Sequence, residues 1–233
     1  MSYPEQLVHR VEEGVAVFSR YPIVEHSYIL LPRDAEDTND FHQRICLRVR
    51  VLLPSSNSSF LDVFVTHLSL SAQAQERSVV AIWKFMRRFA LQGVPGLLMG
   101  DLNAEPSHRA IQYALLRQGL KITCYLLFDA RFLHGKIALE GGVRVHGLRD
   151  LWLERHPEPT SEGDFGYTFP ASPQPIKRID FIFSSNPNEI QARADPKSTA
   201  PSVALETVDI IRHEHSSLLM SDHHGLVARV KVL

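Results

Sequence analysis

The chain of 233 residues is 44% hydrophobic, carries a formal net charge of −1 at pH 7 and has an isoelectric point near 6.9. A chain of this length can bury roughly 70 to 75% of its unfolded surface, so we expect one domain spanning residues 1–233. The near-zero charge gives no overall positive field for nucleic acid, and no apolar run approaches the roughly 20 residues of a membrane span. We therefore expect a soluble, cytoplasmic monomer, to which nucleic acid would bind only through a local basic patch.

Short strands and one long helix are predicted in the first part of the chain. Apolar runs at residues 15–18 and 28–31 are typical of short strands. Residues 45–53 alternate apolar and polar side chains, and with residues 60–65 they predict a hairpin closed by a polar loop. In residues 72–92 the apolar positions recur every three or four residues, which predicts an amphipathic helix.

The remaining chain continues with a second helix and further strands. Residues 97–102 predict a strand, and Ser107 is the expected N-cap of a helix that ends near Gln118. A strand, a helix and a strand at this spacing predict an α/β layered domain. Later strands are expected at residues 167–169, 179–183, 203–211 and 226–232, with a loop at residues 187–201.

Two groups of basic residues are candidates for a local anion-binding patch. The first alternates along the strand at residues 45–53, and the second lies on the polar side of the long helix. Charged residues in such positions are commonly solvated, so we interpret both groups as solvent-facing. The groups are Arg44, Arg48 and Arg50 in the strand, and Lys84, Arg87 and Arg88 in the helix.

The two cysteines, Cys46 and Cys124, both lie inside apolar runs. Free cysteine is among the most buried residue types, and two isolated cysteines do not make a disulfide framework. We therefore expect two buried free thiols.

A carboxylate and a carboxamide follow the apolar run of residues 96–99, in the segment Met99-Gly100-Asp101-Leu102-Asn103. Residues i and i+2 of a strand share a face, so Asp101 and Asn103 are expected to project together at the strand's end. Two oxygen-bearing groups at a strand tip suit a hard cation or an attacking water. A strand that simply leaves the sheet through a polar turn is the alternative.

Three further polar clusters also lie at the ends of apolar runs. In chain order, the set resembles the motifs of the endonuclease/exonuclease/phosphatase superfamily, over about Gly14 to Leu233. That superfamily includes nucleases of the DNase I type, inositol-polyphosphate phosphatases and neutral sphingomyelinases, which are metal-dependent hydrolases of phosphate esters. The clusters are Thr66-His67, Arg178-Ile179-Asp180 and Ser221-Asp222-His223, accompanied by Gly14-Val15-Ala16-Val17-Phe18-Ser19-Arg20 and Gly166-Tyr167-Thr168-Phe169.

The resemblance implies a DNase I-like fold, in which two mixed, mostly antiparallel β-sheets pack face to face between helical layers. It implies a phosphodiesterase or phosphatase that requires Mg²⁺, with Mn²⁺ as a possible substitute. The Gly-Tyr-Thr-Phe and Lys-Arg-Ile-Asp-Phe-Ile-Phe elements are more similar to sphingomyelinase-like members than to abasic-site nucleases. A phospholipid or a small phosphodiester is therefore the expected substrate, in preference to nucleic acid.

The resemblance also assigns roles to individual residues. Asp101 and Asn103 would position the nucleophile and hold phosphate or metal, with Asp222 beside them as a further metal ligand. His223 would accept the water's proton or stabilise the transition state, and Asp180 would fix its ring. His67 would face the phosphate from the other side as a donor or leaving-group acid, and Arg44 matches a phosphate-contacting arginine of some members.

One departure from the family pattern concerns the N-terminal strands. Family members carry an Asn and then a Gln-Glu pair, whose Glu is the principal metal ligand, in strands upstream of the first match. Glu5, Glu12 and Glu13 do not follow an apolar strand, so we do not transfer that role to them. We expect a truncated member that lacks the first strands. The alternative function is a weakened or inactive member that acts as a binding or interaction module.

Simpler interpretations exist for single residues. His67 would be a strand-end histidine, Asp180 a surface ion pair with Arg178, and Asp222 a turn residue. A structural zinc site is a further alternative, with His213, His215, His223 and His224 as its candidate ligands.

Overall fold

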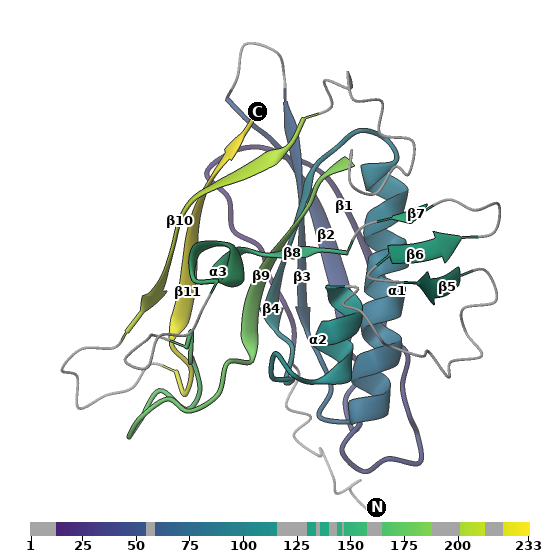
Figure 1. Cartoon of the computed structure of the whole chain (residues 1–233), viewed down its shortest axis with the longest axis vertical. Helices are drawn as coiled ribbons and strands as arrows, with labels where there is room; N and C mark the ends of the chain where they lie inside the picture. The colour runs from purple at the N-terminus through teal and green to yellow at the C-terminus, as the bar shows by residue number, and fades with distance from the viewer. Residues whose placement is uncertain are drawn as a thin grey trace, which may run out of the picture.

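The computed structural model describes residues 13–54, 59–115, 130–133, 136–139, 144–145, 147–157, 165–187, 201–212 and 221–233. Its strands form three sheets (Figure 1). The largest has six strands in the order β1-β2-β3-β4-β9-β8, namely β1 Ile23–Leu30, β2 Ile45–Leu52, β3 Phe60–His67, β4 Gly96–Asp101, β9 Asp180–Ser185 and β8 Arg149–Asp150. The second pairs β10 Val203–Ile211 with β11 Gly225–Val232, and the third contains β5 Ala130–Leu133, β6 Lys136–Leu139 and β7 Arg144–Val145.

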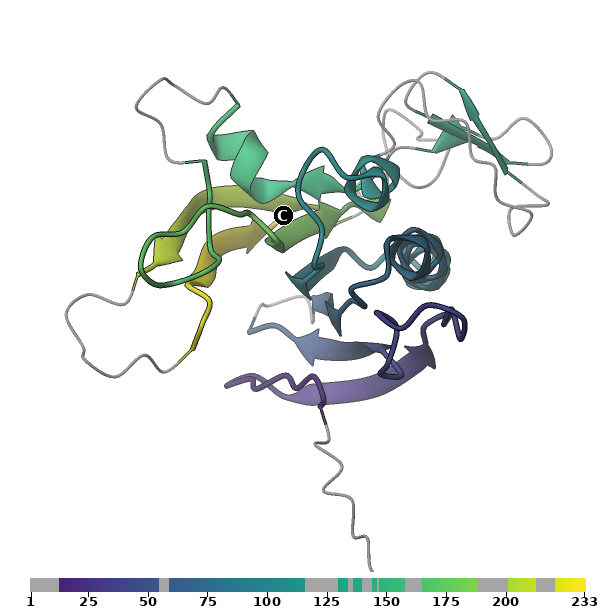
Figure 2. The same cartoon turned by 90° about the horizontal axis from the view of Figure 1, so that it is seen from below.

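Helices cover one face of the six-stranded sheet, and the two-stranded sheet lies against the other face (Figure 2). Helix α1 (Ala72–Ala90) connects β3 to β4, which pair in parallel, and α2 (Arg109–Ala114) packs beside it. Helix α3 (Leu151–Arg155) contacts β9 and β10 at the edge of the two sheets. The predicted α/β class, with two sheets and flanking helices, is confirmed.

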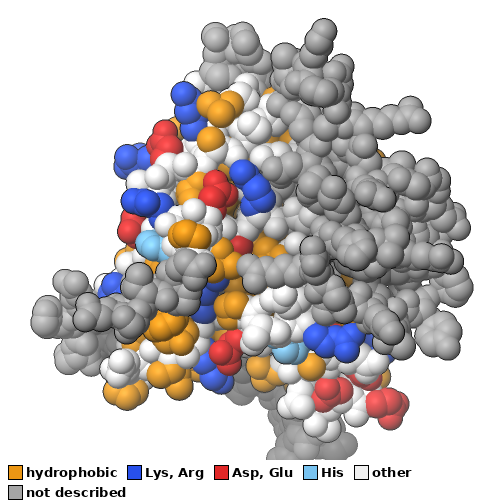
Figure 3. Space-filling model, viewed as in Figure 1, with side chains coloured by type: hydrophobic (Ala, Val, Ile, Leu, Met, Phe, Trp, Pro, Cys, Tyr) orange, Lys and Arg blue, Asp and Glu red, His pale blue; other side chains and the backbone are white. Residues whose placement is uncertain are grey.

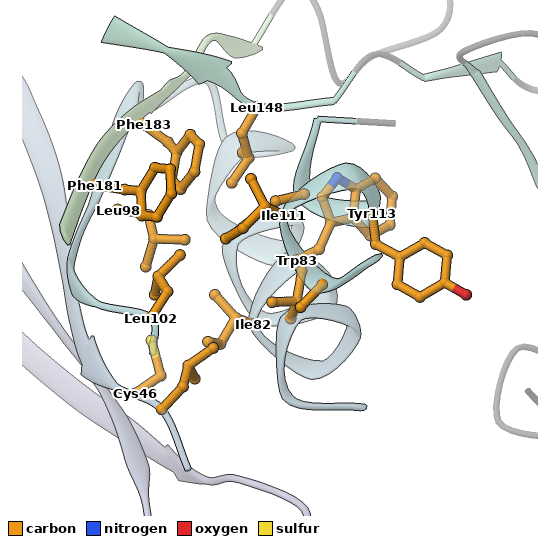
Figure 4. Packing of buried hydrophobic residues seen from close by; sticks show 14 of the residues in the cluster. Cys46, Ile82, Trp83, Leu98, Leu102, Ile111, Tyr113, Leu148, Phe181 and Phe183 are labelled. Atoms are coloured by element: carbon orange, nitrogen blue, oxygen red, sulfur yellow. The ribbon is translucent and has the colours of Figure 1, made fainter. Parts of the chain in front are cut away.

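The pleat of the strands divides the core into two clusters. On one face, side chains such as Cys46 and Phe183 pack against Ile82 and Ile111 of the helices (Figure 4). On the other face, residues such as Val49 pack toward β10 and β11. Successive side chains of a strand point to opposite faces, so the alternation in β2 supplies both clusters.

Helix α1 begins and ends where the sequence pattern indicates. Its N-cap is Ser71, whose hydroxyl accepts a hydrogen bond from the N–H of Ala74 at 3.3 Å. The helix ends at Ala90, and Gly93 adopts a φ of 81° just beyond it. No helix in the described part of the chain is long and apolar enough to cross a membrane.

Three predicted elements differ in the structure. Residues 15–18 form no strand, and Phe18 is exposed there, because an apolar run becomes a strand only where a neighbour offers hydrogen bonds. Helix α2 begins at Arg109 with His108 as its N-cap, in place of Ser107, and position 118 lies outside the described residues. Residues 167–169 contain only an isolated bridge, from Phe169 to Lys177.

The interpretation of the strand arginines as solvent-facing is wrong, because Arg44 and Arg50 are only 13% and 11% exposed and Arg48 is buried. The side chain of Arg48 is 2% exposed, donates to Asp62 at 2.7 Å and lies 3.6 Å from the ring centre of Phe89 in α1. The side-chain alternation of β2 points Arg48 toward the helix, where the buried carboxylate of Asp62 compensates its charge. Lys84 and Arg88 are exposed on α1, as predicted.

Cys46 is a buried free thiol, as predicted, and burial raises its pKa to about 12. Cys124 lies outside the described residues. On the face shown in Figure 3, Lys and Arg side chains are interspersed with Asp and Glu, so the described surface there has no single basic patch.

Candidate active site

The register of the six-stranded sheet places three of the predicted site residues in one row. His67 at the end of β3 is aligned with Asp101 at the end of β4, and Asp101 is aligned with Asp180 at the start of β9. Directly opposed residues on neighbouring strands lie on the same face of a sheet. Residues separated by 113 positions in the sequence, His67 and Asp180, therefore flank the same carboxylate.

The close approach of β4 to β3 depends on Gly100. Its φ is 139°, and a Cβ at this position would lie 1.9 Å from the carbonyl oxygen of Thr66. A side chain here would push the two strand ends apart, so glycine is required for the alignment of Asp101 with His67.

The carboxylate of Asp101 lies between two imidazole rings. Its Oδ2 is 3.4 Å from Nε2 of His67 and 3.8 Å from Nε2 of His223. Burial raises the pKa of Asp101, and the negative charge of Asp180 adds to this rise. The N–H of Asn103 donates to Oδ1 at 2.8 Å and partly opposes it.

The ring of His223 is held by Asp180. Nδ1 of His223 donates to Oδ2 of Asp180 at 2.8 Å, and the same oxygen accepts a hydrogen bond from Oγ1 of Thr168 at 2.6 Å. Burial alone would lower the pKa of His223, but the hydrogen bond and charge of Asp180 outweigh it and raise the pKa. Nε2 of His223 is thereby turned toward Asp101.

The segment around Thr168 also fixes the backbone that carries His223. The N–H of His224 donates to the carbonyl of Thr168 at 2.8 Å, and the N–H of Ala171 donates to the carbonyl of Asp222 at 2.7 Å. The ring of Phe169 packs 4.8 Å from the ring of His223. The Gly-Tyr-Thr-Phe element thus orients the loop before β11.

Arg44 and Glu13 lie on the other side of His67. NH1 of Arg44 donates to Nδ1 of His67 at 3.2 Å and also forms an ion pair with the carboxylate of Glu13. Burial lowers the pKa of His67, and the positive charge of Arg44 lowers it further. An imidazole with these neighbours is neutral near pH 7, with Nδ1 as the acceptor because arginine has no acceptor.

Asn103 occupies a different position from the one that the strand pattern predicts, and Asp222 lies in the segment before β11. Strand β4 ends at Asp101, and Asn103 lies beyond it in a turn with a φ of 47°, where its side-chain amide donates to the carbonyl of Leu68 at 2.9 Å. Asp222 is exposed, and its negative charge contributes to the raised pKa of His223. Residues i and i+2 share a face only within a strand, and the turn takes Asn103 out of the strand.

Several supporting residues were not identified from the sequence. Thr168 was noted only as part of a motif, and Glu13 was set aside because no apolar strand precedes it. Gln75 of α1 donates to the carbonyls of Ser69 at 2.7 Å and Asn103 at 2.9 Å, which ties the loops after β3 and β4 together. Gln75 is a polar residue on the apolar face of an amphipathic helix, and this position indicates a buried hydrogen-bonding role.

The alternative of a surface ion pair between Asp180 and Arg178 is wrong. Arg178 is buried and pairs with the buried Asp150, the N-cap residue of α3. Asp180 pairs with His223 instead. Arg178 lies before β9, and each of the two charged residues finds its partner in another part of the fold. The zinc alternative includes residues 213 and 215, which lie outside the described chain.

The sequence model of the protein family described as "Endonuclease/Exonuclease/phosphatase family" matches residues 3–223 of the chain. The chain belongs to this family. A comparison with curated protein sequences finds no match.

Solved structures with the same fold include three at 16 to 17% identity. A family protein from Bacteroides thetaiotaomicron superposes with a TM-score of 0.58, covering 90% of this chain and 66% of its own. A mannosyl-6-phosphatase from the same organism superposes with a TM-score of 0.56, and the match covers 91% of this chain and 67% of the phosphatase. TDP2 from D. rerio, complexed with a single-strand DNA product, also has a TM-score of 0.56, and the match covers 90% of this chain and 68% of TDP2. This chain thus spans about two thirds of each neighbour, and the likeness shows the fold.

Members of this family generally depend on divalent metal ions, and the donor groups present here fit such an ion. Among the described residues, ligand atoms of Asp101, Asp180 and His223 lie within 4.8 Å of one another. Burial raises the pKa of Asp101, and the like charge of the aligned Asp180 adds to this rise, so the two carboxylates lie close enough to repel each other. A cation bound between them would relieve this repulsion.

Proposed function

We propose that the chain hydrolyses phosphate esters with a divalent cation, for which Mg²⁺ is the first choice and Mn²⁺ a substitute. The observation that supports this most is the arrangement around Asp101, with the Asp180 and His223 pair on one side and His67 with Arg44 on the other. Carboxylates, imidazoles and a guanidinium together can orient a water and bind a phosphoryl group.

Asp101 and Asp180 would hold the cation, with Asn103 and Asp222 as further candidate ligands from the loops beside them. A divalent cation at this position supplies Lewis-acid stabilisation of the phosphoryl oxygens when it is bound. Carboxylate oxygens are the ligands that Mg²⁺ prefers, which supports Asp101 as the central ligand. Asp101 and Asn103 would also orient the attacking water through their side-chain oxygens.

His223 would act mainly as a cationic hydrogen-bond donor. Its pKa is raised by Asp180, so the ring stays protonated to higher pH than an ordinary histidine. With Nδ1 committed to Asp180, the proton on Nε2 faces the site and would stabilise negative charge on the phosphoryl group. This favours transition-state stabilisation over acceptance of the water's proton.

His67 would be a neutral donor on the opposite side of the phosphate. Its Nδ1 accepts from Arg44, which leaves the ring proton on Nε2, the atom that lies 3.4 Å from Asp101. From that position Nε2–H would donate to a phosphoryl or leaving oxygen. Arg44 would contact the phosphate directly through its remaining N–H groups.

The proposed substrate is a small phosphodiester or a phospholipid head group. The formal net charge of −1 and the mixed charges on the face shown in Figure 3 support this preference over nucleic acid. The neighbouring structures include a mannosyl-6-phosphatase and a protein complexed with a single-strand DNA product, so the fold alone does not determine the substrate.

The test is hydrolysis of bis-p-nitrophenyl phosphate by the purified chain. We expect release of p-nitrophenol that requires Mg²⁺, is abolished by EDTA and returns when Mg²⁺ is added in excess. Turnover that survives EDTA unchanged would contradict the metal-dependent mechanism.

A second candidate function is phosphate binding without turnover. Among the described residues, the close group of candidate metal ligands consists of Asp101, Asp180 and His223 without a glutamate, and this favours the second function. Binding of inorganic phosphate measured by calorimetry, together with no turnover of any phosphate ester under the same conditions, would select this second function.

A further inference from the structure

We propose that Glu13 partly neutralises the charge of Arg44. The site therefore selects singly charged phosphodiesters over doubly charged phosphomonoesters. This inference rests on the proposed function and deepens it. The observation behind it is the ion pair between Glu13 and Arg44 directly beside His67.

The ion pair is part of a continuous chain of contacts that ends at the centre of the site. Glu13 contacts NH1 of Arg44, the same nitrogen lies 3.2 Å from His67, and His67 lies 3.4 Å from Asp101. Glu13 is therefore separated from His67 by a single guanidinium, and the same guanidinium lies between Glu13 and a phosphate bound beside His67.

Arg44 has the features of an anion-binding group. Its side chain is only 13% exposed, and its Nε is buried without a hydrogen-bond partner in the part of the chain that the structure describes. A guanidinium offers five N–H donors in a planar fork that matches carboxylate and phosphate oxygens alike. The carboxylate of Glu13 therefore pairs with an arginine whose full positive charge would otherwise attract a phosphate.

Glu13 itself does not have the features of a structural residue. Its side chain is 41% exposed, and it belongs to a segment that forms no helix or strand. A carboxylate that remains in contact with water contributes little to stability through an ion pair. The pair therefore adds little to the fold, while its charge lies next to the candidate catalytic groups.

The charge of a phosphate ester depends on the number of ester bonds. A phosphodiester carries one negative charge, whereas a phosphomonoester has a second pKa of about 6 and carries nearly two negative charges above neutral pH. A neutralised arginine attracts the extra charge of a monoester less than a free arginine does. Glu13 thereby disfavours the monoester more than the diester.

The first experiment compares the wild-type chain with Glu13→Gln and with Glu36→Gln, an exposed glutamate in the loop after β1 that serves as the matched control. The kcat/KM values for p-nitrophenyl phosphate and bis-p-nitrophenyl phosphate are measured at pH 8. We expect Glu13→Gln to raise the monoester-to-diester ratio on the order of tenfold, from removal of one nearby charge in a partly exposed site. Glu36→Gln should leave the ratio unchanged, and an equal ratio in all three proteins would overturn the inference.

The second experiment measures binding without turnover. Calorimetry at pH 8 gives the affinities of inorganic phosphate and of dimethyl phosphate for wild type, Glu13→Gln, Arg44→Gln and the double variant. We expect Glu13→Gln to tighten phosphate binding about tenfold and to change dimethyl phosphate binding much less. The effect of Glu13→Gln should disappear when Arg44 is already replaced, because the glutamate acts through that charge.

The two experiments separate the inference from the function on which it rests. Selective tightening of phosphate binding in Glu13→Gln without turnover in any variant would contradict the proposed hydrolysis and support the charge role of Glu13. Turnover of both esters with an unchanged ratio, and phosphate affinity equal to that of Glu36→Gln, would support hydrolysis and overturn the charge role. Thermal melting of each variant shows whether the fold is retained.

Discussion

Oδ2 of Asp180 accepts a hydrogen bond from Nδ1 of His223 at 2.8 Å, across 43 residues of sequence. The aspartate begins β9, and the histidine lies in the short loop that enters β11, so the bond joins the two sheets at the site. It also determines which ring nitrogen faces Asp101 and in which protonation state. The predictions about chemistry depend on this contact.

The first prediction is that Asp180→Asn lowers the pKa of His223. The variant keeps the size of the side chain but removes the negative charge that raises the histidine pKa against the opposing effect of burial. The C–H signals of the imidazole in an NMR titration give the value directly. Asp209→Asn, at an exposed position of β10, is the control and should leave the His223 titration unchanged.

The raised pKa of His223 also predicts the pH dependence of stability. Its folded-state value lies above the unfolded value of about 6.5, so the stabilisation by Asp180 is fully present below pH 6.5. The stabilisation is lost as the pH rises through the folded-state pKa. The melting temperature of Asp180→Asn should therefore fall below that of wild type more at pH 5.5 than at pH 9, and an equal difference at both would contradict the assignment.

The second prediction concerns the two groups next to the proposed phosphate. His223→Ala and Asp101→Asn should each reduce hydrolysis of bis-p-nitrophenyl phosphate by about 100- to 10,000-fold, the usual range for loss of an acid, a base or a charge stabiliser. Circular dichroism should show that both variants remain folded, since neither side chain belongs to a hydrophobic cluster. His26→Ala, at an exposed position of β1, is the control, and full activity in a folded His223→Ala protein would refute the proposed role.

The strands that carry the site could be predicted because each is an apolar run that ends in a polar residue. Strand β10 has the predicted bounds, and β9 and β11 differ by one or two residues at their ends. The grouping of His67, Asp101 and Asp180 came from resemblance, because strand order cannot be read from residue periodicity. The parallel pairing of β3 with β4 and the antiparallel pairing of β4 with β9 provide the physical reason for that grouping.

Contacts that depend on tertiary structure could not be predicted. The alternation in β2 predicted that Arg48 shares a face with Cys46, but not that this face lies under α1, where Asp62 compensates the charge. Thr168 likewise looked like any residue of a short apolar motif. Its hydrogen bond to Asp180 exists only because the segment around Thr168 meets the start of β9. Sequence patterns specify faces of elements, whereas such contacts require the arrangement of the elements.

The third prediction tests the buried pair of Arg48 and Asp62, whose side chains are 2% and 1% exposed. Asp62→Ala should lower the free energy of unfolding by about 3 to 5 kcal/mol, because it leaves a buried guanidinium without its main counter-charge. Urea denaturation followed by circular dichroism measures the change. Glu25→Gln removes the half-exposed partner of the same arginine and should cost at most about 1 kcal/mol. A similar loss of unfolding free energy in both variants would show that burial does not determine the contribution of these ion pairs to stability.

The fourth prediction concerns Thr168, which donates to the same oxygen of Asp180 that holds His223. Thr168→Val keeps the shape of the side chain but removes this donor, so the carboxylate charge is less satisfied and interacts more strongly with the imidazolium. We therefore expect Thr168→Val to raise the pKa of His223, opposite in direction to Asp180→Asn, and to lower kcat about tenfold through misplacement of the ring. Thr168→Ser retains a hydroxyl and should restore both values toward wild type. NMR titration and steady-state kinetics measure the two effects, and a His223 pKa that is identical in wild type, Val and Ser variants would show that Thr168 only fills space.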